Sequence, residues 1–184
     1  IVGEKIENIL LKKLEFRIKN NKFVERVHVQ KGIKGTLIAK IKQSRPIARI
    51  IDKDSSYYIG SKGEILPFIT KHTARVVVIT GEGLSSLFFK NVLTKQDSSF
   101  AQFIQCFEQD VFLKKQIASI NYLKSGEAII YPQITKQAIE FGDLTQIEDK
   151  FKRLKIFYKK ILPYKGWNTY ESVSVKFKGQ IICK

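Results

Sequence analysis

The last seventeen residues alternate between polar and apolar side chains with a period of two, which is the repeat of a β-strand. The alternation runs from Tyr170 to Phe177, Lys178-Gly179 interrupts it, and β-branched residues follow as far as Cys183. A Lys-Gly pair between two such runs is typical of a tight turn. The pattern predicts a β-hairpin at the end of the chain. A terminal strand is often a sheet edge, whose free N–H and C=O groups are either protected by charge or used to bind a strand of another protein.

Three segments show the repeat of an amphipathic helix. The first covers Glu4–Lys19, the second begins at a cap near Asp97 or Ser98, and the third begins at Asp143 or Thr145. The apolar stripe of the second helix is Phe100, Phe103, Ile104, Phe107 and Val111, and that of the third is Phe151, Leu154, Tyr158 and Ile161.

The third helix is expected to stop at Pro163 and Gly166. Its basic residues fall between the apolar ones and are expected to face water: Lys150, Lys152, Arg153, Lys155, Lys159 and Lys160.

Period-two alternation and β-branched residues predict strands between these helices. The run Arg75–Thr80 is almost unbroken, which is typical of a strand covered on both faces. The expected strands are Phe23–Gln30, Thr36–Gln43, Ile47–Asp52, Tyr57–Ile59, Ile65–Pro67, Arg75–Thr80, Ile117–Leu123, Ala128–Tyr131 and Gln137–Phe141, before the terminal hairpin.

Ser44-Arg45-Pro46 is expected to bend the chain, because proline cannot donate to a β-ladder. The elements around this bend predict a small unit over residues 1–50, and residues 51–184 form a second, larger unit. The predicted fold class is α+β. The larger unit is expected to be a mostly antiparallel β domain with two helices and the C-terminal hairpin.

The charge of the chain raises nucleic acid or an anionic membrane as a partner, because 33 Lys and Arg face 17 Asp and Glu, a net charge of +16. The basic residues recur singly between apolar residues, as on the solvated faces of helices and strands. A surface for nucleic acid requires aromatic residues interleaved with basic ones, and only Tyr57-Tyr58 and Trp167 lie outside the predicted core stripes. Nucleic-acid binding remains the alternative hypothesis.

Catalytic and metal-binding patterns are not found. Cys106 and Cys183 form no CxxC pair, and no His, Asp or Glu follows His28 or His72 at the third or fourth position after it. Gly81-Glu82-Gly83 lacks the third glycine of a dinucleotide fingerprint and is interpreted as a turn. We therefore expect neither an enzyme nor a cofactor or metal. Without a long apolar run or a signal peptide, the chain is expected to be a piece of a longer protein.

Several segments together resemble the FtsQ/DivIB family of cell-division proteins. Residues 23–29, 35–41 and 43–50 resemble the second half of its POTRA domain, with Arg45 and Pro46 at the bend. Residues 57–67 resemble the entry into its second domain, followed by a valine strand ending at Thr80-Gly81. The helix from Asp149, then Trp167, Tyr170 and residues 180–182, resemble its C-terminal helix and hairpin.

The resemblance implies a non-enzymatic scaffold of the division machinery that binds FtsB and FtsL. The parent protein would have a short cytoplasmic tail and one transmembrane helix in the inner membrane, with this region in the periplasm at the division septum. A complete POTRA domain would also have a strand and a helix before Glu4, so the N-terminal domain here is expected to be partial. A POTRA-bearing chaperone of outer-membrane assembly is a third possibility.

In this family a strand of FtsB adds to the last strand of the second domain. Carried over by position, the resemblance implies that Lys176 is the basic residue and Phe177 the aromatic residue of that site. The exposed strand would then be Gly179–Cys183. We therefore expect a partner segment to pair along Gln180, Ile181, Ile182 and Cys183, an apolar side chain to pack on Phe177, and Lys176, Lys178 and Lys184 to attract acidic residues.

Overall fold

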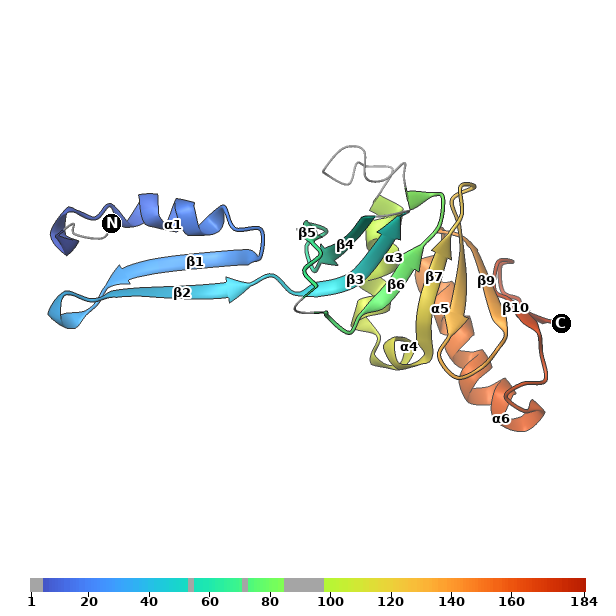
Figure 1. Cartoon of the computed structure of the whole chain (residues 1–184). Coiled ribbons are helices and arrows are strands. Elements are labelled where there is room, and N and C mark those ends of the chain that lie inside the picture. Colours follow the sequence, from blue (N-terminus) through green and yellow to red (C-terminus); the bar gives the residue numbers. More distant parts are fainter. Residues whose placement is uncertain (1–4, 53–54, 71–72, 85–97) are drawn as a thin grey trace. The chain divides into compact units, whose positions relative to one another are not determined.

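The computed structural model describes residues 5–52, 55–70, 73–84 and 98–184, and these divide into two compact units, Ile1–Arg45 and Pro46–Lys184. Figure 1 labels their helices and strands. The division lies between Arg45 and Pro46, earlier than the boundary at residue 50 that the sequence suggested. The strand from Pro46 therefore belongs to the second unit, because it pairs with strands of the larger sheet.

The first unit consists of a helix and a two-stranded antiparallel ribbon. A 3₁₀ turn, Ile6–Asn8, precedes helix α1, Leu11–Lys19, so the expected continuous helix is interrupted. Strand β1, Val24–Lys31, pairs with β2, Leu37–Gln43, and a second 3₁₀ turn, Ile33–Gly35, joins them.

The second unit is built on a nine-stranded mixed sheet in the order β11-β10-β9-β8-β7-β6-β3-β4-β5, counted over the described residues. Three pairs are parallel, namely β3 with β6, β6 with β7 and β9 with β10, and the others are antiparallel. The α+β class is thus confirmed. The strands are β3 Pro46–Asp52, β4 Ser55–Gly60, β5 Ile65–Pro67, β6 Val77–Thr80, β7 Ile117–Tyr122, β8 Glu127–Pro132, β9 Ala138–Asp143, β10 Ser172–Ser174 and β11 Ile182–Cys183.

Helices cover one face of this sheet (Figure 1). They are α3 Ser98–Gln109, α4 Val111–Gln116, α5 Ile147–Ile156 and α6 Leu162–Lys165, with a π-helical turn, Phe157–Ile161, between α5 and α6. Phe103 of α3 lies at the centre of the core, with its ring 5.0 Å from that of Phe141 and 5.4 Å from that of Phe151. The other face is only partly covered, so the β6 run expected to be buried on both faces has Val78 and Thr80 half-buried.

Two expectations for the helices are wrong. Val111 was assigned to the apolar stripe but is 68% exposed, because the Asp110 carboxylate caps a new helix by accepting from the amides of Phe112 and Leu113. Pro163 does not stop the last helix, because it occupies the first turn of α6, where its missing N–H costs little. Gly166, at φ 100°, ends α6 as expected.

Candidate partner-binding edge

Strand β11 is the last strand of the sheet, and among the described residues it pairs only with β10. Its partners across the ladder are Val173 for Cys183 and Ser174 for Ile182. The expectation that the chain ends on a sheet edge therefore agrees with the structure. One row of main-chain groups along β11 faces away from the sheet.

The register identifies which groups face outward. Lys184 donates to Ser172 at 3.0 Å and accepts from it at 3.2 Å, so these two residues form a hydrogen-bonded pair. In an antiparallel ladder, hydrogen-bonded and non-bonded pairs alternate along the strands. Ile182 therefore directs its N–H and C=O inward, to Ser174. The N–H and C=O groups of Cys183, which belongs to the non-bonded pair with Val173, point outward.

The hairpin itself is looser than the alternation predicted. Only Ser172–Ser174 and Ile182–Cys183 are strands, and the residues between them form a long loop. The Lys178-Gly179 turn is present inside this loop, with the Gln180 amide donating to the Phe177 carbonyl at 3.3 Å. Pairing of β10 with β11 ends at Ser174 and Ile182, while the next residue, Val175, still donates to Glu140 of β9 at 3.0 Å, so residues 175–181 are left as the loop.

Phe177 is 52% exposed at the first position of this turn, and Lys178 and Gln180 are exposed beside it. Ile181 and Cys183 are half-buried and pack against the core. The residues from Phe177 to Cys183, which the sequence predicted as the partner-binding site, therefore lie together in the turn and the strand that follows it. An apolar side chain, a turn and a short free strand lie next to one another there.

Lys176 lies at the start of the loop and is exposed. Its ammonium forms an ion pair with Glu127 of β8, and this carboxylate raises the pKa of Lys176. The stem of Lys176 crosses Gly142, where an added Cβ would lie 2.7 Å from Cγ of the lysine. Lys176 therefore already binds an acidic residue of the same sheet.

Arg153 is a residue of this site that the sequence analysis assigned to solvent. It is only 6% exposed, and its Nη1 donates to the carbonyl oxygens of Phe177 and Gln180, at the two ends of the turn. Its Nε donates to Asp149 at 3.0 Å. The i,i+4 spacing of Asp149 and Arg153 was the only local signal, because the two carbonyls are distant in sequence.

Lys150 was also expected to face water, but its side chain is 3% exposed. Its ammonium donates to the Asp143 carbonyl at 2.8 Å and pairs with the Asp143 carboxylate. The hydrogen bond from Lys150 lowers the pKa of Asp143. Lys155 likewise pairs with Asp110 at 2.6 Å. The basic stripe of α5 is thus partly structural.

The two remaining signature residues lie at the junction of the units. Arg45 is exposed, and Pro46 begins β3 opposite Gly60 of β4. Their position fits a bend at a strand start.

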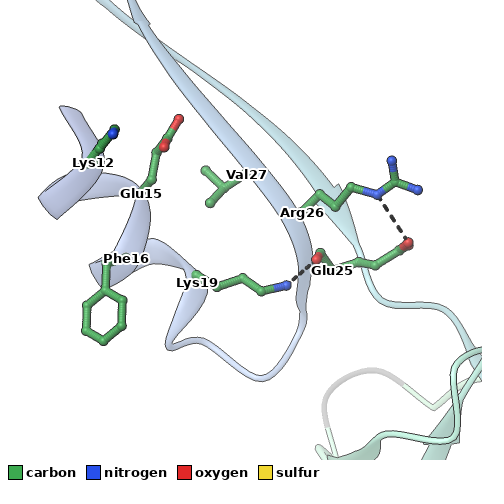
Figure 2. Close-up of a pocket in the computed structure, with 7 residues that line it drawn as sticks. All are labelled: Lys12, Glu15, Phe16, Lys19, Glu25, Arg26 and Val27. Carbon is green, nitrogen blue, oxygen red and sulfur yellow. Dashed lines mark hydrogen bonds and ion pairs between the residues drawn. The ribbon is translucent and has the colours of Figure 1, made fainter.

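An open groove of about 390 Å³ lies between α1 and β1 in the first unit, lined by Lys12, Glu15, Phe16, Lys19, Glu25, Arg26 and Val27 (Figure 2). Lys19 donates to the Glu25 carbonyl, and the Glu25 carboxylate lies 3.0 Å from Lys42 and 3.7 Å from Arg26. Among the charged lining residues, Glu25 and Arg26 thus pair with each other, and Glu15 binds His28 and the Val29 amide outside the lining.

The described cysteines and histidine form neither a disulfide nor a metal cluster. Cys106 and Cys183 are free thiols, and burial raises the pKa of each. His28 lies 3.3 Å from Glu15, and the described residues contain no group of three or more potential metal ligands. His72, and Ser86 after the glycine turn, lie outside the described residues.

A family model described as FtsQ/DivIB, C-terminal related matches residues 45–184, which is most of the chain and begins at the division between the two units. The chain belongs to the FtsQ/DivIB-related family. No curated protein matches it. Membership in this family, a family of non-enzymatic division scaffolds, suggests a scaffold role in cell division with protein partners of the division machinery.

Family membership also suggests a membrane-associated protein, and it gives no support to nucleic-acid binding. Within the described part of this FtsQ/DivIB-related chain, no helix is both long and apolar enough to span a bilayer.

Proposed function

We propose that this chain is a scaffold of the bacterial division machinery that binds FtsB, and through it FtsL, by accepting an extended segment along β11. The observation that carries the proposal is the free edge of β11, where the main-chain groups of Cys183 point outward. A partner strand there would form backbone hydrogen bonds, and these provide adhesion in strand addition.

Side chains around the edge would select the partner. Phe177 offers an exposed apolar surface of the kind that anchors an interface. Lys178 is exposed beside Phe177 in the turn, and Lys184 is exposed after β11. A partner segment with acidic residues on both sides of an apolar residue would therefore fit best. Lys176 contributes less in this proposal, because it is paired with Glu127. The net charge of +16 would mainly raise the rate of association with an acidic partner.

By resemblance, the proposal extends to the rest of the protein. The first unit would be part of a POTRA domain, and Arg45 and Pro46 would mark its junction with the β domain. Both units would lie in the periplasm at the septum, with the parent protein anchored in the inner membrane by one helix.

A proline at position 183 tests strand addition directly, because it removes an outward donor. We expect Cys183→Pro to weaken binding of the purified extracytoplasmic region of FtsB by roughly tenfold or more, measured by calorimetry, since each lost hydrogen bond is worth about 1 kcal/mol and the strand must also shift. Cys183→Ala is the matched control, because it removes the thiol and keeps the N–H.

The register also predicts how a neighbouring proline acts. Ile182→Pro removes an inward donor and should detach β11 from β10, which hydrogen exchange at Ser174 would report. Normal folding of Cys183→Pro together with unchanged affinity for FtsB would show that β11 is not the binding edge.

A further inference from the structure

The four residues Phe177–Gln180 form a turn that presents the exposed ring of Phe177. The Gln180 amide donates to the Phe177 carbonyl at 3.3 Å, and Gly179 has φ 70°. A positive φ at the third residue is typical of a type II turn. An added Cβ on Gly179 would meet no atom within 4 Å, so packing around Gly179 does not hold the turn in place.

Arg153 supplies the missing support from the helical layer. One nitrogen, Nη1, donates to the carbonyls of both Phe177 and Gln180, the first and last residues of the turn. The side chain is almost fully buried, and hydrogen bonds from a charged donor are stronger in such surroundings. The turn is therefore tied to α5 at both ends by a single guanidinium.

Asp149 fixes the direction of that guanidinium. It lies one helical turn before Arg153 on α5 and accepts from Nε at 3.0 Å. The planar fork of arginine can donate to a carboxylate on one side and to carbonyls on the other, which a lysine ammonium cannot do in one fixed geometry. Asp149, Arg153 and the two carbonyls of the turn thus form a continuous series of hydrogen bonds from α5 to the loop.

A pre-ordered turn lowers the cost of binding. Each side chain that must be immobilised on association costs about 0.5–1.5 kcal/mol, and a loop adds its own ordering cost. With Arg153 in place, Phe177 and the start of β11 are ordered before a partner arrives.

We propose that Arg153 is a positioning residue for partner binding, acting through the carbonyls of Phe177 and Gln180 rather than by touching the partner. The inference rests on the proposed function, since it assigns a residue that shapes the same edge. Arg153 sets the place of the Phe177 ring relative to the outward main-chain groups of Cys183.

The test compares Arg153→Met with Lys152→Met in the full chain. Both remove one positive charge from α5, but Lys152 is exposed and has no contact with the turn in the described structure. For Arg153→Met we expect faster hydrogen exchange at the Gln180 amide without partner, and a roughly tenfold higher Kd for the extracytoplasmic region of FtsB. Lys152→Met should change neither by more than about twofold.

Two milder variants separate positioning from general stability. Arg153→Lys keeps the charge and should recover only part of the affinity, because an ammonium holds two carbonyls less rigidly. Asp149→Ala keeps the bonds to both carbonyls but frees Nε, and should raise Kd about two- to threefold. If Arg153→Met does not fold, as judged by Trp167 fluorescence, these two variants decide the question.

Failure of the inference and failure of the proposed function give different results. If Cys183→Pro weakens binding and Arg153→Met leaves both exchange and Kd unchanged, the edge stands and the positioning role is wrong. If Arg153→Met accelerates exchange but Kd stays unchanged, the turn is held by Arg153 without serving the partner, and the inference is again overturned. If neither variant changes Kd, the proposed function itself is wrong.

Discussion

The two units of the chain carry the same net charge on very different frameworks. The first unit has 12 Lys and Arg against 4 Glu, a net +8 over 45 residues, and the 139 residues from Pro46 to Lys184 carry the other +8. The first unit buries few apolar side chains, among them Ile9 and Val29, and β2 is almost entirely exposed. The second buries a continuous core under its sheet. The second unit should therefore be the more stable by a wide margin, because a two-stranded ribbon is marginal alone.

The most deeply buried ion pairs of the two units are built in opposite senses. In the first unit the buried member is the Glu25 carboxylate, and its partners Lys42 and Arg26 are exposed. In the second the buried members are the cations Lys150 and Arg153, and Asp143 and Asp149 are exposed. Removing the exposed acid from the second unit leaves a buried cation behind. Removing the buried acid from the first leaves cations that water can solvate.

The largest effect is expected from Phe103→Ala. Phe103 is fully buried among aromatic rings, and such a truncation typically costs 3–5 kcal/mol because of the cavity it leaves. Trp167, the one tryptophan, lies in the second unit, so its fluorescence reports the urea unfolding of that unit.

Hydrogen exchange of β1 and β2 provides the internal control. If the units are energetically independent, exchange in the first unit should be unchanged by Phe103→Ala. Equal acceleration in both units would show that the comparison drawn above is wrong and that the chain unfolds as one body.

A smaller effect is expected from Asp143→Asn, because Lys150 then keeps only neutral acceptors for a buried ammonium. The free energy of unfolding of the second unit should fall by roughly 1.5–3 kcal/mol, measured by the same fluorescence transition. Asp149→Asn should lower it by a similar amount, because buried Arg153 then loses its carboxylate partner. Lys150→Met should cost less, because Asp143 is exposed and regains water.

The pH dependence of the same pair has a definite sign. The pKa of Asp143 is lowered in the folded chain, so the folded state binds fewer protons than the unfolded one. This contribution is complete above the unfolded value of about 4 and is lost as pH falls through the folded value. The fluorescence midpoint of the parent chain should fall more steeply below pH 4 than that of Asp143→Asn, and parallel curves would contradict the assignment.

Features that depend on local spacing could be predicted from the sequence, and features that depend on distant partners could not. The stripe of Phe100, Phe103 and Phe107 was placed correctly, because helical spacing alone decides which face is buried. The roles of Lys150 and Arg153 were missed, because their partners are the carboxylate at the end of strand β9 and two carbonyls of a distant turn. No local pattern encodes such partners.

The terminal edge was predicted in part for the same reason. Alternation and the Lys178-Gly179 pair located the turn and the last strand. The length of the loop was not predicted, because alternation from Tyr170 to Phe177 does not show that pairing with β11 ends at Ser174. The ion pair of Lys176 was not predicted, because its partner Glu127 lies on β8, far from it in sequence.

The smallest effect is expected from Glu25→Gln in the first unit. The carboxylate is buried, but the glutamine keeps an acceptor for Lys42, and both Lys42 and Arg26 can turn to solvent. We expect the free energy of unfolding of the first unit to fall by about 1 kcal/mol. The β1 and β2 amides should then exchange faster, and Trp167 fluorescence should be unchanged. Glu7→Gln, a change of the same charge at an exposed residue, is the control. Glu25→Gln could instead lower the free energy of unfolding as much as Asp143→Asn does. The exposed cations of the first unit would then depend on their carboxylate as strongly as buried Lys150 depends on Asp143. Which member of the pair is buried, the acid or the cation, would then not decide the effect of removing the acid.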